Sequence, residues 1–259
     1  YSPEGNATGS IKGVTAKLDY LAELGIEYIW MTPVYQSPQH DNGYDVSDYY
    51  AIDPSYGTME DLDELIREAE ARGIGLMMDI VVNHSSTEHE WFQKSLAGDE
   101  RYRDYYIWRD EPTNWESKFG GNAWEYDEKS GQYYLHLFDV TQADLNWENE
   151  QMREDVYEMM RFWRKKGIKG FRLDVINLIS KEQDFPEDES DGRKFYTDGP
   201  RIHEYLKEMN REVFDGHDVI TVGEMSSTTL DHCVRYSNPD ENELSMTFSF
   251  HHLKVDYPN

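Results

Sequence analysis

Helix and strand patterns alternate along most of this 259-residue chain, and that alternation limits its possible folds more than any other feature. Apolar residues recur at the spacing of amphipathic helices over residues 11–24, 58–72, 150–166 and 200–213. Short apolar runs over residues 26–31, 74–82, 169–173, 219–222 and 244–250 predict strands between and after these helices. Repeated strand–helix–strand units of this size form a parallel sheet with right-handed crossovers, so we expect an α/β fold.

The predicted sheet fits part of a (β/α)8 TIM barrel better than a dinucleotide-binding sheet. None of the predicted strands is followed by the glycine fingerprint that a dinucleotide-binding sheet requires. A barrel of this class has eight strands, and only five can be counted here. We therefore expect the sequence to be a fragment that lacks both ends of the barrel.

The alternation fails between about residues 84 and 147, which hold five of the seven tryptophans. This segment is too long for an ordinary connection between a strand and a helix. We predict that residues 84–147 form a small domain inserted at the C-terminal face of the barrel, after its third strand. Residues 1–83 and 148–259 are then the N-terminal and central parts of the barrel. Most of the aromatic side chains are expected to pack inside the insert.

Composition excludes several classes of partner. The formal net charge of −27 argues against nucleic acid and anionic membranes, which both require a basic surface. No run of about 18 apolar residues is present that could span a membrane. Cys233 is the only cysteine, which excludes an internal disulfide. Nothing in the sequence indicates an oligomeric state. An anionic ligand would need a local basic cluster to overcome the repulsion of the whole chain.

Polar residues end three of the predicted strands. These ends read Asp79-Ile80-Val81-Val82-Asn83-His84, Arg172-Leu173-Asp174 and Val222-Gly223-Glu224. Because the C-terminal ends of barrel strands surround the active site, Asp174 and Glu224 should be neighbours. An isolated Arg-x-Asp pattern fits a structural ion pair better than a catalytic site, but three polar strand ends in this order point to a site.

Two neighbouring carboxyl groups suit retaining glycoside hydrolysis. At roughly 5–5.5 Å apart, one serves as nucleophile and the other as general acid and base. Arg172 precedes Asp174 by two residues, so both side chains point the same way and the carboxylate is held ionised. Glu224 has no arginine beside it in the sequence, which makes it the better candidate for the acid.

The three motifs resemble the first three signature regions of the α-amylase superfamily, glycoside hydrolase family 13, and the resemblance covers essentially the whole chain. It implies an enzyme in which Asp174 is the nucleophile and Glu224 the acid/base. The loop His40-Asp41-Asn42-Gly43-Tyr44-Asp45 and the segment Leu137-Phe138-Asp139-Val140-Thr141-Gln142 also match substrate-facing regions of the family. The resemblance thus implies that the glucosyl ring is bound by Asp41, Tyr44, His84, Phe138, Gln142 and Arg172.

The sequence departs from the family pattern in two places. A fourth signature region, with a third catalytic carboxylate, would lie beyond Asn259, so we expect this fragment alone to be inactive. Many relatives bind Ca²⁺ in an Asp-rich loop near the N-terminus, whereas the matching residues 2–10 hold one carboxylate. Since Ca²⁺ prefers several charged oxygen ligands, we expect no metal there, and no cofactor is predicted elsewhere.

The substrate is indicated by the second half of the chain. Residues 195–201, 224–229 and 250–258 resemble members of the family that hydrolyse α,α-trehalose 6-phosphate. Within the last of these, His251, His252 and Lys254 supply a local positive charge, and we predict that they bind the 6-phosphate of the leaving glucose. The partner is then a small sugar phosphate, and the resemblance implies a cytoplasmic catabolic role.

Two alternatives stay open at this point. The first is an oligo-1,6-glucosidase acting on isomaltose-type sugars, which uses the same chemistry on a neutral substrate; Val175 after the nucleophile resembles that group. The second is a non-catalytic binding subunit of the same family, such as the heavy chains of amino-acid transporters. Such subunits need a membrane segment, and some lack the carboxylates that Asp174 and Glu224 supply here.

Overall fold

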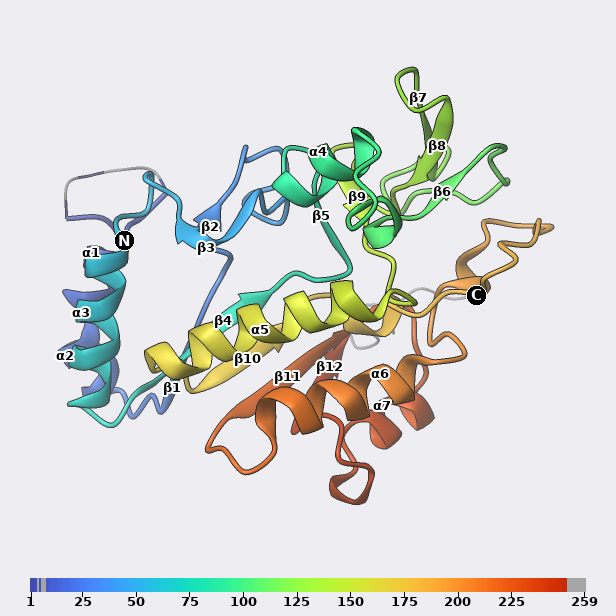
Figure 1. Ribbon diagram of the computed structural model, residues 1–259. Coiled ribbons are helices and arrows are strands. Elements are labelled where there is room, and N and C mark those ends of the chain that lie inside the picture. The colour runs from blue at the N-terminus through green and yellow to red at the C-terminus, as the bar shows by residue number, and fades with distance from the viewer. Residues whose placement is uncertain (4, 6–7, 251–259) are drawn as a thin grey trace, which may run out of the picture.

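A five-stranded parallel sheet forms the centre of the structure, a computed structural model that describes residues 1–3, 5 and 8–250 (Figure 1). Its strand order is β1–β4–β10–β11–β12, and every neighbouring pair is parallel. The strands are β1 (Tyr28–Met31), β4 (Gly75–Ile80), β10 (Gly170–Leu173), β11 (Ile220–Met225) and β12 (Met246–Ser249). This sheet confirms the predicted α/β fold and partial barrel, because consecutive barrel strands pair in chain order.

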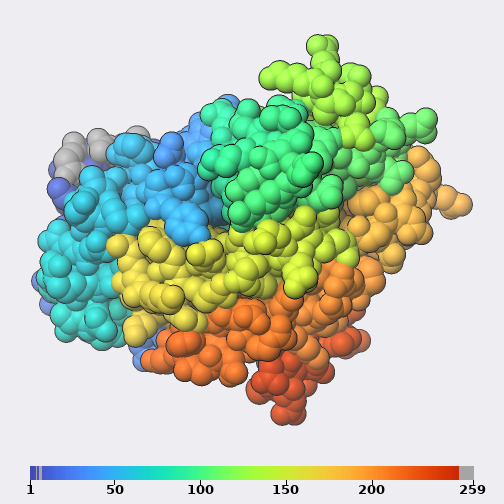
Figure 2. All heavy atoms as spheres, viewed as in Figure 1, coloured from blue at the N-terminus to red at the C-terminus, as the bar shows by residue number. Residues whose placement is uncertain are grey.

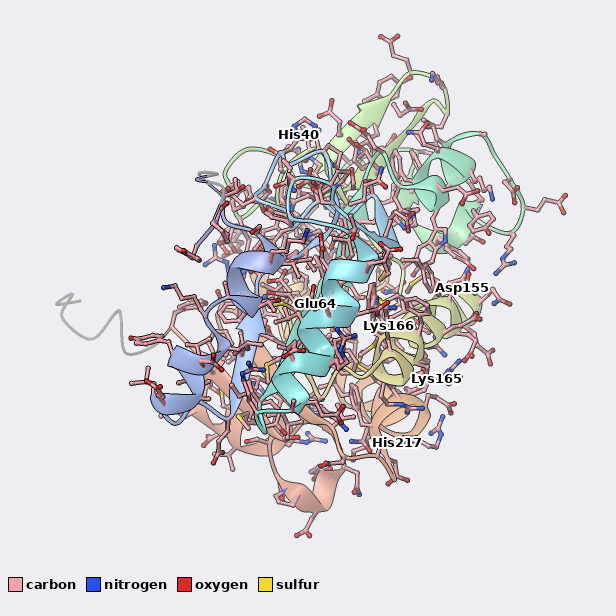
Figure 3. All side chains as sticks on the ribbon, turned by 90° about the vertical axis from the view of Figure 1, so that its left-hand side faces the viewer. His40, Glu64, Asp155, Lys165, Lys166 and His217 are labelled. Carbon is pink, nitrogen blue, oxygen red and sulfur yellow. The ribbon has the colours of Figure 1, made fainter. Side chains whose placement is uncertain are left out.

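Helices follow the strands and pack on the outside of the sheet (Figure 1). The longer helices are α3 (Met59–Glu70), α5 (Glu150–Lys166) and α6 (Ile202–Met209), and α7 (Leu230–Tyr236) lies between β11 and β12. A capping box starts α3, with the Thr58 and Asp61 side chains each bonded to the other's backbone N–H. Figure 3 shows α3 and α5 side by side, where Lys166 of α5 pairs with Asp63 of α3 at 2.5 Å.

The predicted helix over residues 11–24 is wrong in one respect, because it breaks into α1 (Ile11–Thr15) and α2 (Leu18–Glu23). Two β-branched residues, Val14 and Thr15, end α1, and the Thr15 hydroxyl donates to the Ile11 carbonyl. Such residues have low helix propensity, and a hydroxyl bonded back to the preceding turn competes with helix continuation. The predicted 200–213 helix also changes, since residues after Met209 continue as a π-helical turn, η4 (Asn210–Phe214).

Residues 84–147 form two small antiparallel sheets that lie beyond the ends of β4 and β10. Figure 2 shows these residues, in green, as a lobe above α5. One sheet pairs β5 (His84–Ser86) with β9 (Gln142–Asp144), and the other has the order β6–β8–β7. The remaining elements here are α4 (Glu90–Leu96), η1 (Arg103–Tyr105), β6 (Trp108–Arg109), β7 (Trp124–Asp127) and β8 (Gln132–Leu135). That this segment is a separate domain with these boundaries remains our prediction.

Two apolar clusters hold the barrel strands and the 84–147 segment together. The larger cluster runs from the sheet and its helices into the base of the segment, where Phe92, Tyr105 and Tyr106 are buried. The smaller cluster packs Trp115 and Trp124 against Phe185 and Tyr196, which follow β10. Most of the tryptophans are therefore structural, as the sequence predicts.

The other regular elements are short connections around these layers. They are β2 (Tyr35–Gln36), β3 (Asp48–Ile52), η2 (Ile176–Leu178), η3 (Arg193–Phe195) and η5 (Pro239–Glu241). Across the described ranges, none of the helices has both the length and the apolar character needed to cross a membrane.

His89 makes the stability of the 84–147 segment depend on pH. The ring is buried between Tyr49 and Trp91, and its Nδ1 accepts the Trp91 N–H at the start of α4. Burial lowers the pKa of His89 from 6.5 to about 4, because the charged ring would lose its hydration. Between these values the unfolded chain binds a proton that the folded chain does not.

We expect the His89 contribution to the free energy of unfolding to be complete above pH 6.5. It should fall by about 3 kcal/mol as the pH decreases to 4. His89→Asn keeps a capping acceptor but cannot be protonated. Denaturant titrations of both proteins at several pH values should show the stability difference shrinking as the pH falls; a difference that does not change with pH would contradict the assignment.

Candidate active site

The register of the sheet brings the three predicted strand ends together. Arg172 in β10 lies opposite Asp79 in β4 and Val222 in β11. Because neighbouring parallel strands in register present the same face, the Arg172 and Asp79 side chains point the same way. Glu224 lies two residues after Val222 and Asp174 two residues after Arg172, so all four polar side chains share one face at the C-terminal end of the sheet.

Arg172 binds three carboxylates at once. Its Nη1 donates to Asp79 Oδ1 at 2.8 Å and to Asp174 Oδ1 at 2.5 Å, and its Nη2 pairs with Glu224 Oε2. All four residues are buried, with exposed fractions of 8% or less. Glu224 has no arginine beside it in the sequence, but the pairing of β10 with β11 brings Arg172 to it. Asp174 and Glu224 are neighbours held by one guanidinium.

Asp79 is a member of this cluster whose role the sequence did not assign. Its Oδ2 accepts from Trp30 Nε1 and from the Tyr44 hydroxyl, both at 3.1 Å. Burial, followed by the charge of Asp174, raises the pKa of Asp79 to about 7. The available signal was a single acid within an otherwise apolar strand, which is costly to bury unless partners surround it.

His84 organises the other side of the site. Its Nε2 lies 3.1 Å from the Tyr44 carbonyl and its Nδ1 lies 3.2 Å from Asn83 Nδ2, which fits a ring that donates through Nε2 and accepts through Nδ1. Phe138 packs on the ring at 5.1 Å between centroids. Gln142 Nε2 lies 3.2 Å from His84 Nε2 and donates to Asp41 Oδ2 at 3.0 Å. Burial raises the pKa of Asp41.

The predicted ring-binding residues therefore converge on one place, although they come from distant parts of the sequence. Asp41 and Tyr44 lie in the loop between β2 and β3, while Phe138 and Gln142 lie near the end of the 84–147 segment. Asp45 shapes the first of these loops, because its carboxylate accepts the backbone N–H groups of His40 and Asp41. The chain after Asp174 leaves the strand at once, since Val175 has a left-handed φ of 39°.

A buried ion pair joins the 84–147 segment to the barrel behind His84. Lys181 Nζ lies 3.0 Å from Asp144 Oδ2 and donates to Asn83 Oδ1 at 3.1 Å. Asn83 Nδ2 in turn donates to Asp144 Oδ2, and both acidic and basic side chains are almost fully buried. Burial lowers the pKa of the Lys181 ammonium. Sequence reasoning missed this pair, because Lys181 and Asp144 carry no motif.

The loop after Glu224 is fixed by side chains from the loops that follow β10. Asn177 accepts the Ser226 N–H at 2.8 Å and donates to the Ser226 carbonyl at 2.9 Å. Asp198 Oδ1 accepts from Asn177 Nδ2 at 3.0 Å, and its Oδ2 accepts from the Thr228 hydroxyl at 2.7 Å. Glu224 is thereby followed by a loop with one defined path.

Some predicted residues lie outside the described part of the chain. His251, His252 and Lys254 belong to this group, and the N-terminal stretch 2–10, where no metal is expected, is described only in part. Among the residues that the structure does describe, no group of three or more His, Cys, Asp or Glu side chains could hold a metal ion.

This arrangement can support nucleophilic and acid–base catalysis on a neutral sugar ring. Asp174 and Glu224 are close enough to share Arg172, and a pair of adjacent carboxyl groups is the requirement for double displacement at a sugar carbon. Tyr44, Phe138 and His84 add flat faces beside the pair, which suit the apolar face of a pyranose ring.

Comparisons with known proteins agree with this geometry. A family model described as the alpha amylase catalytic domain matches residues 2–259. The chain is 65% identical over 263 residues to a trehalose-6-phosphate hydrolase of Bacillus subtilis (strain 168), covering 98% of this chain and 47% of the relative. It is 57% identical to the trehalose-6-phosphate hydrolase of Escherichia coli (strain K12), covering 98% of this chain and 47% of the relative. It is 52% identical to an oligo-1,6-glucosidase of Bacillus cereus, covering 97% of this chain and 47% of the relative.

A solved structure gives the same result. The crystal structure of a Bacillus licheniformis trehalose-6-phosphate hydrolase aligns with a TM-score of 0.94 at 65% identity, covering 96% of this chain and 46% of that protein. The chain thus spans about half the length of the relatives that it matches.

Removing the buried ammonium should be costly. Lys181→Met leaves the Asp144 carboxylate buried without its cation, which we expect to lower the free energy of unfolding by about 3–5 kcal/mol. Lys207→Met is the matched control, because Lys207 pairs with Glu241 near the surface and its loss should barely change stability. Denaturant unfolding of the three proteins measures the effect, and similar small losses in both variants would contradict a structural role for Lys181.

Proposed function

The chain belongs to the α-amylase catalytic-domain family, and from this premise we propose that its protein is a retaining α-glucoside hydrolase acting on α,α-trehalose 6-phosphate. The products are glucose and glucose 6-phosphate. The observation that carries the proposal is the Asp174–Arg172–Glu224 cluster at adjacent strand ends, in a chain 65% and 57% identical to two trehalose-6-phosphate hydrolases.

The proposed mechanism has two displacements. Glu224 protonates the bridging oxygen while Asp174 attacks the anomeric carbon of the unphosphorylated ring, so glucose 6-phosphate leaves and a glucosyl–Asp174 ester forms. Glu224, now a carboxylate, removes a proton from water that attacks the same carbon. Glucose leaves with its original configuration, and both carboxyl groups return to their starting states.

Arg172 and Asp79 support these steps without reacting. Arg172 orients the Asp174 carboxylate, since it donates to Oδ1 at 2.5 Å. Contacts through His84 and Gln142 join Asp41, Tyr44 and Phe138 into one group, and we assign these five residues to the glucosyl ring of the substrate. His251, His252 and Lys254 remain a sequence-based assignment for the 6-phosphate.

We also propose a cytoplasmic location and a small sugar phosphate as the partner. A doubly charged phosphate ester does not pass through a bilayer unaided, so an enzyme that consumes it is expected on the side where it is formed. Oligo-1,6-glucosidase activity is the second candidate, supported by the 52% identity to the Bacillus cereus enzyme of that name. The same site residues would serve either substrate.

Replacing Glu224 should slow the reaction according to the leaving group. We expect Glu224→Gln to lower kcat/KM for trehalose 6-phosphate by about 10²–10⁴-fold, since the departing sugar oxygen needs a proton. The loss should be much smaller for p-nitrophenyl α-glucoside, because nitrophenolate leaves without protonation. Kinetics of the full-length protein on both substrates tests this, and equal losses would argue against Glu224 as the acid.

The substrate assignment is tested by hydrolysis of trehalose 6-phosphate and isomaltose at matched concentrations with the full-length protein. We expect a kcat/KM at least about ten-fold higher for the phosphorylated sugar, because one charge-assisted contact is enough for that ratio. A preference for isomaltose would keep Asp174 and Glu224 in their roles but move the protein to the oligo-1,6-glucosidases.

A further inference from the structure

A buried amide holds the chain after Glu224 where strand pairing stops. The pairing of β11 with β10 ends at Gly223 and Leu173, one residue before Glu224. Asn177, which is fully buried, binds both backbone groups of Ser226: its Oδ1 accepts the N–H at 2.8 Å and its Nδ2 donates to the carbonyl at 2.9 Å. The amide thus continues the attachment between the two strands to a point two residues past Glu224.

Asp198 determines which way the Asn177 amide points. The other N–H of Asn177 Nδ2 donates to Asp198 Oδ1 at 3.0 Å, and the Asp198 N–H donates to the Asn177 carbonyl at 2.9 Å. A carboxylate only accepts, so it binds the nitrogen end of the amide and leaves the oxygen end for the Ser226 N–H. A reversed amide would place its oxygen against the carboxylate and its N–H groups against the Ser226 N–H.

The same carboxylate holds the chain after Ser226 by a second route. Its Oδ2 accepts from the Thr228 hydroxyl at 2.7 Å and lies 3.1 Å from His232 Nδ1. Its Oδ1 also accepts from the Tyr236 hydroxyl at 2.5 Å, and only 8% of the Asp198 side chain is exposed. Asp198 is therefore a common acceptor for the turn after β10, the loop after β11, and α7.

The loop between these attachments has an uncommon backbone conformation. Ser227 has a left-handed φ of 55°, which residues other than glycine seldom adopt. Both of its neighbours are bonded, since Thr228 donates to Asp198 and the Ser226 hydroxyl accepts from Lys118 Nζ at 2.9 Å. Loss of these bonds would let the loop relax toward a commoner φ, and this movement would begin close to Glu224.

Asp198 is itself held firmly in its segment. Gly199, the next residue, lies so close to Ser180 that a Cβ on it would meet the Ser180 carbonyl oxygen at 2.0 Å. The Ser180 hydroxyl accepts the Arg201 N–H at 2.9 Å. Asp198 has a left-handed φ of 51°, which asparagine tolerates as well as aspartate does. Asparagine can therefore replace Asp198 without a change of backbone.

We propose that Asp198 is a positioning residue for Glu224, which it orients through Asn177 and Thr228. This rests on the proposed function above, in which Glu224 gives its proton to the leaving sugar. Proton transfer requires the acid to lie within hydrogen-bonding distance of the departing oxygen, and a misplacement of about 1 Å can cost about 100-fold in rate. The contacts of Asp198 described here run to the loop after Glu224, so its loss changes the placement of the acid.

The test compares two substrates of the full-length protein that differ in their need for an acid. Asp198→Asn keeps the size of the side chain but turns one acceptor into a donor that faces donors. It should lower kcat/KM for trehalose 6-phosphate by about ten-fold and for p-nitrophenyl α-glucoside by less than about three-fold, because nitrophenolate leaves without a proton. The inhibition constant of glucose should change little, since the residues assigned to the glucosyl ring are kept.

Asp188→Asn is the matched control. The Asp188 side chain is only 2% exposed, accepts from Ser190 and Gly192, and pairs with Lys194, all within its own loop. Its replacement removes the same charge from the centre of a loop and is expected to leave the ratio of the two kcat/KM values unchanged.

Thr228→Val gives an independent test, because valine has nearly the shape of threonine but cannot donate to Asp198. It should lower the same ratio to a smaller degree. Thermal unfolding of each variant checks that the fold is kept, and Thr228→Val decides the matter if Asp198→Asn does not fold.

The pattern of a lost acid is set by Glu224→Gln. If that variant loses activity selectively on trehalose 6-phosphate, while Asp198→Asn and Thr228→Val keep the wild-type ratio, Asp198 is purely structural and the inference is overturned. If Glu224→Gln itself loses activity equally on both substrates, Glu224 is not the acid; the proposed function then fails in that assignment, and this inference fails with it.

Discussion

The guanidinium of Arg172 is the interaction on which the site depends. Three carboxyl groups buried at one end of a sheet repel one another in their charged forms, and a cation among them offsets that repulsion. Arg172 contacts all three and is itself covered by the faces of Trp30 and Tyr44, at 5.1 and 5.7 Å from the ring centroids. The parallel register of β4, β10 and β11 is what places the arginine among them.

A second buried charge performs a similar task between the barrel and the 84–147 segment. Lys181 follows β10, whereas Asp144 ends β9, and Asn83 leads into His84. The ion pair thus fixes the return of the segment to the barrel beside the residue that faces the sugar. Asn83 contacts His84 as well as both members of the ion pair. Removing the buried cation is therefore expected to affect the orientation of His84 as well as stability.

The sequence predicted the elements of the fold and the members of the site better than it predicted their contacts. Periodicity located α5 at Glu150–Lys166, because a helix depends on neighbours within a few residues. The contact of Arg172 with Glu224 spans 52 residues, the difference between their numbers, and that of Lys118 with Ser226 spans 108. Pairing of this kind depends on strand order and on the path of the inserted segment, which no local pattern encodes.

The charges in the site determine which part of a bound molecule is stabilised beside the carboxyl groups. The floor of the site holds Asp79, Asp174 and Glu224 around a single guanidinium, so a group that becomes positive there is stabilised. The same carboxyl groups repel an anion, so an anionic part of a bound molecule is expected to face away from Asp174 and Glu224. This repulsion would also favour the departure of an anionic product.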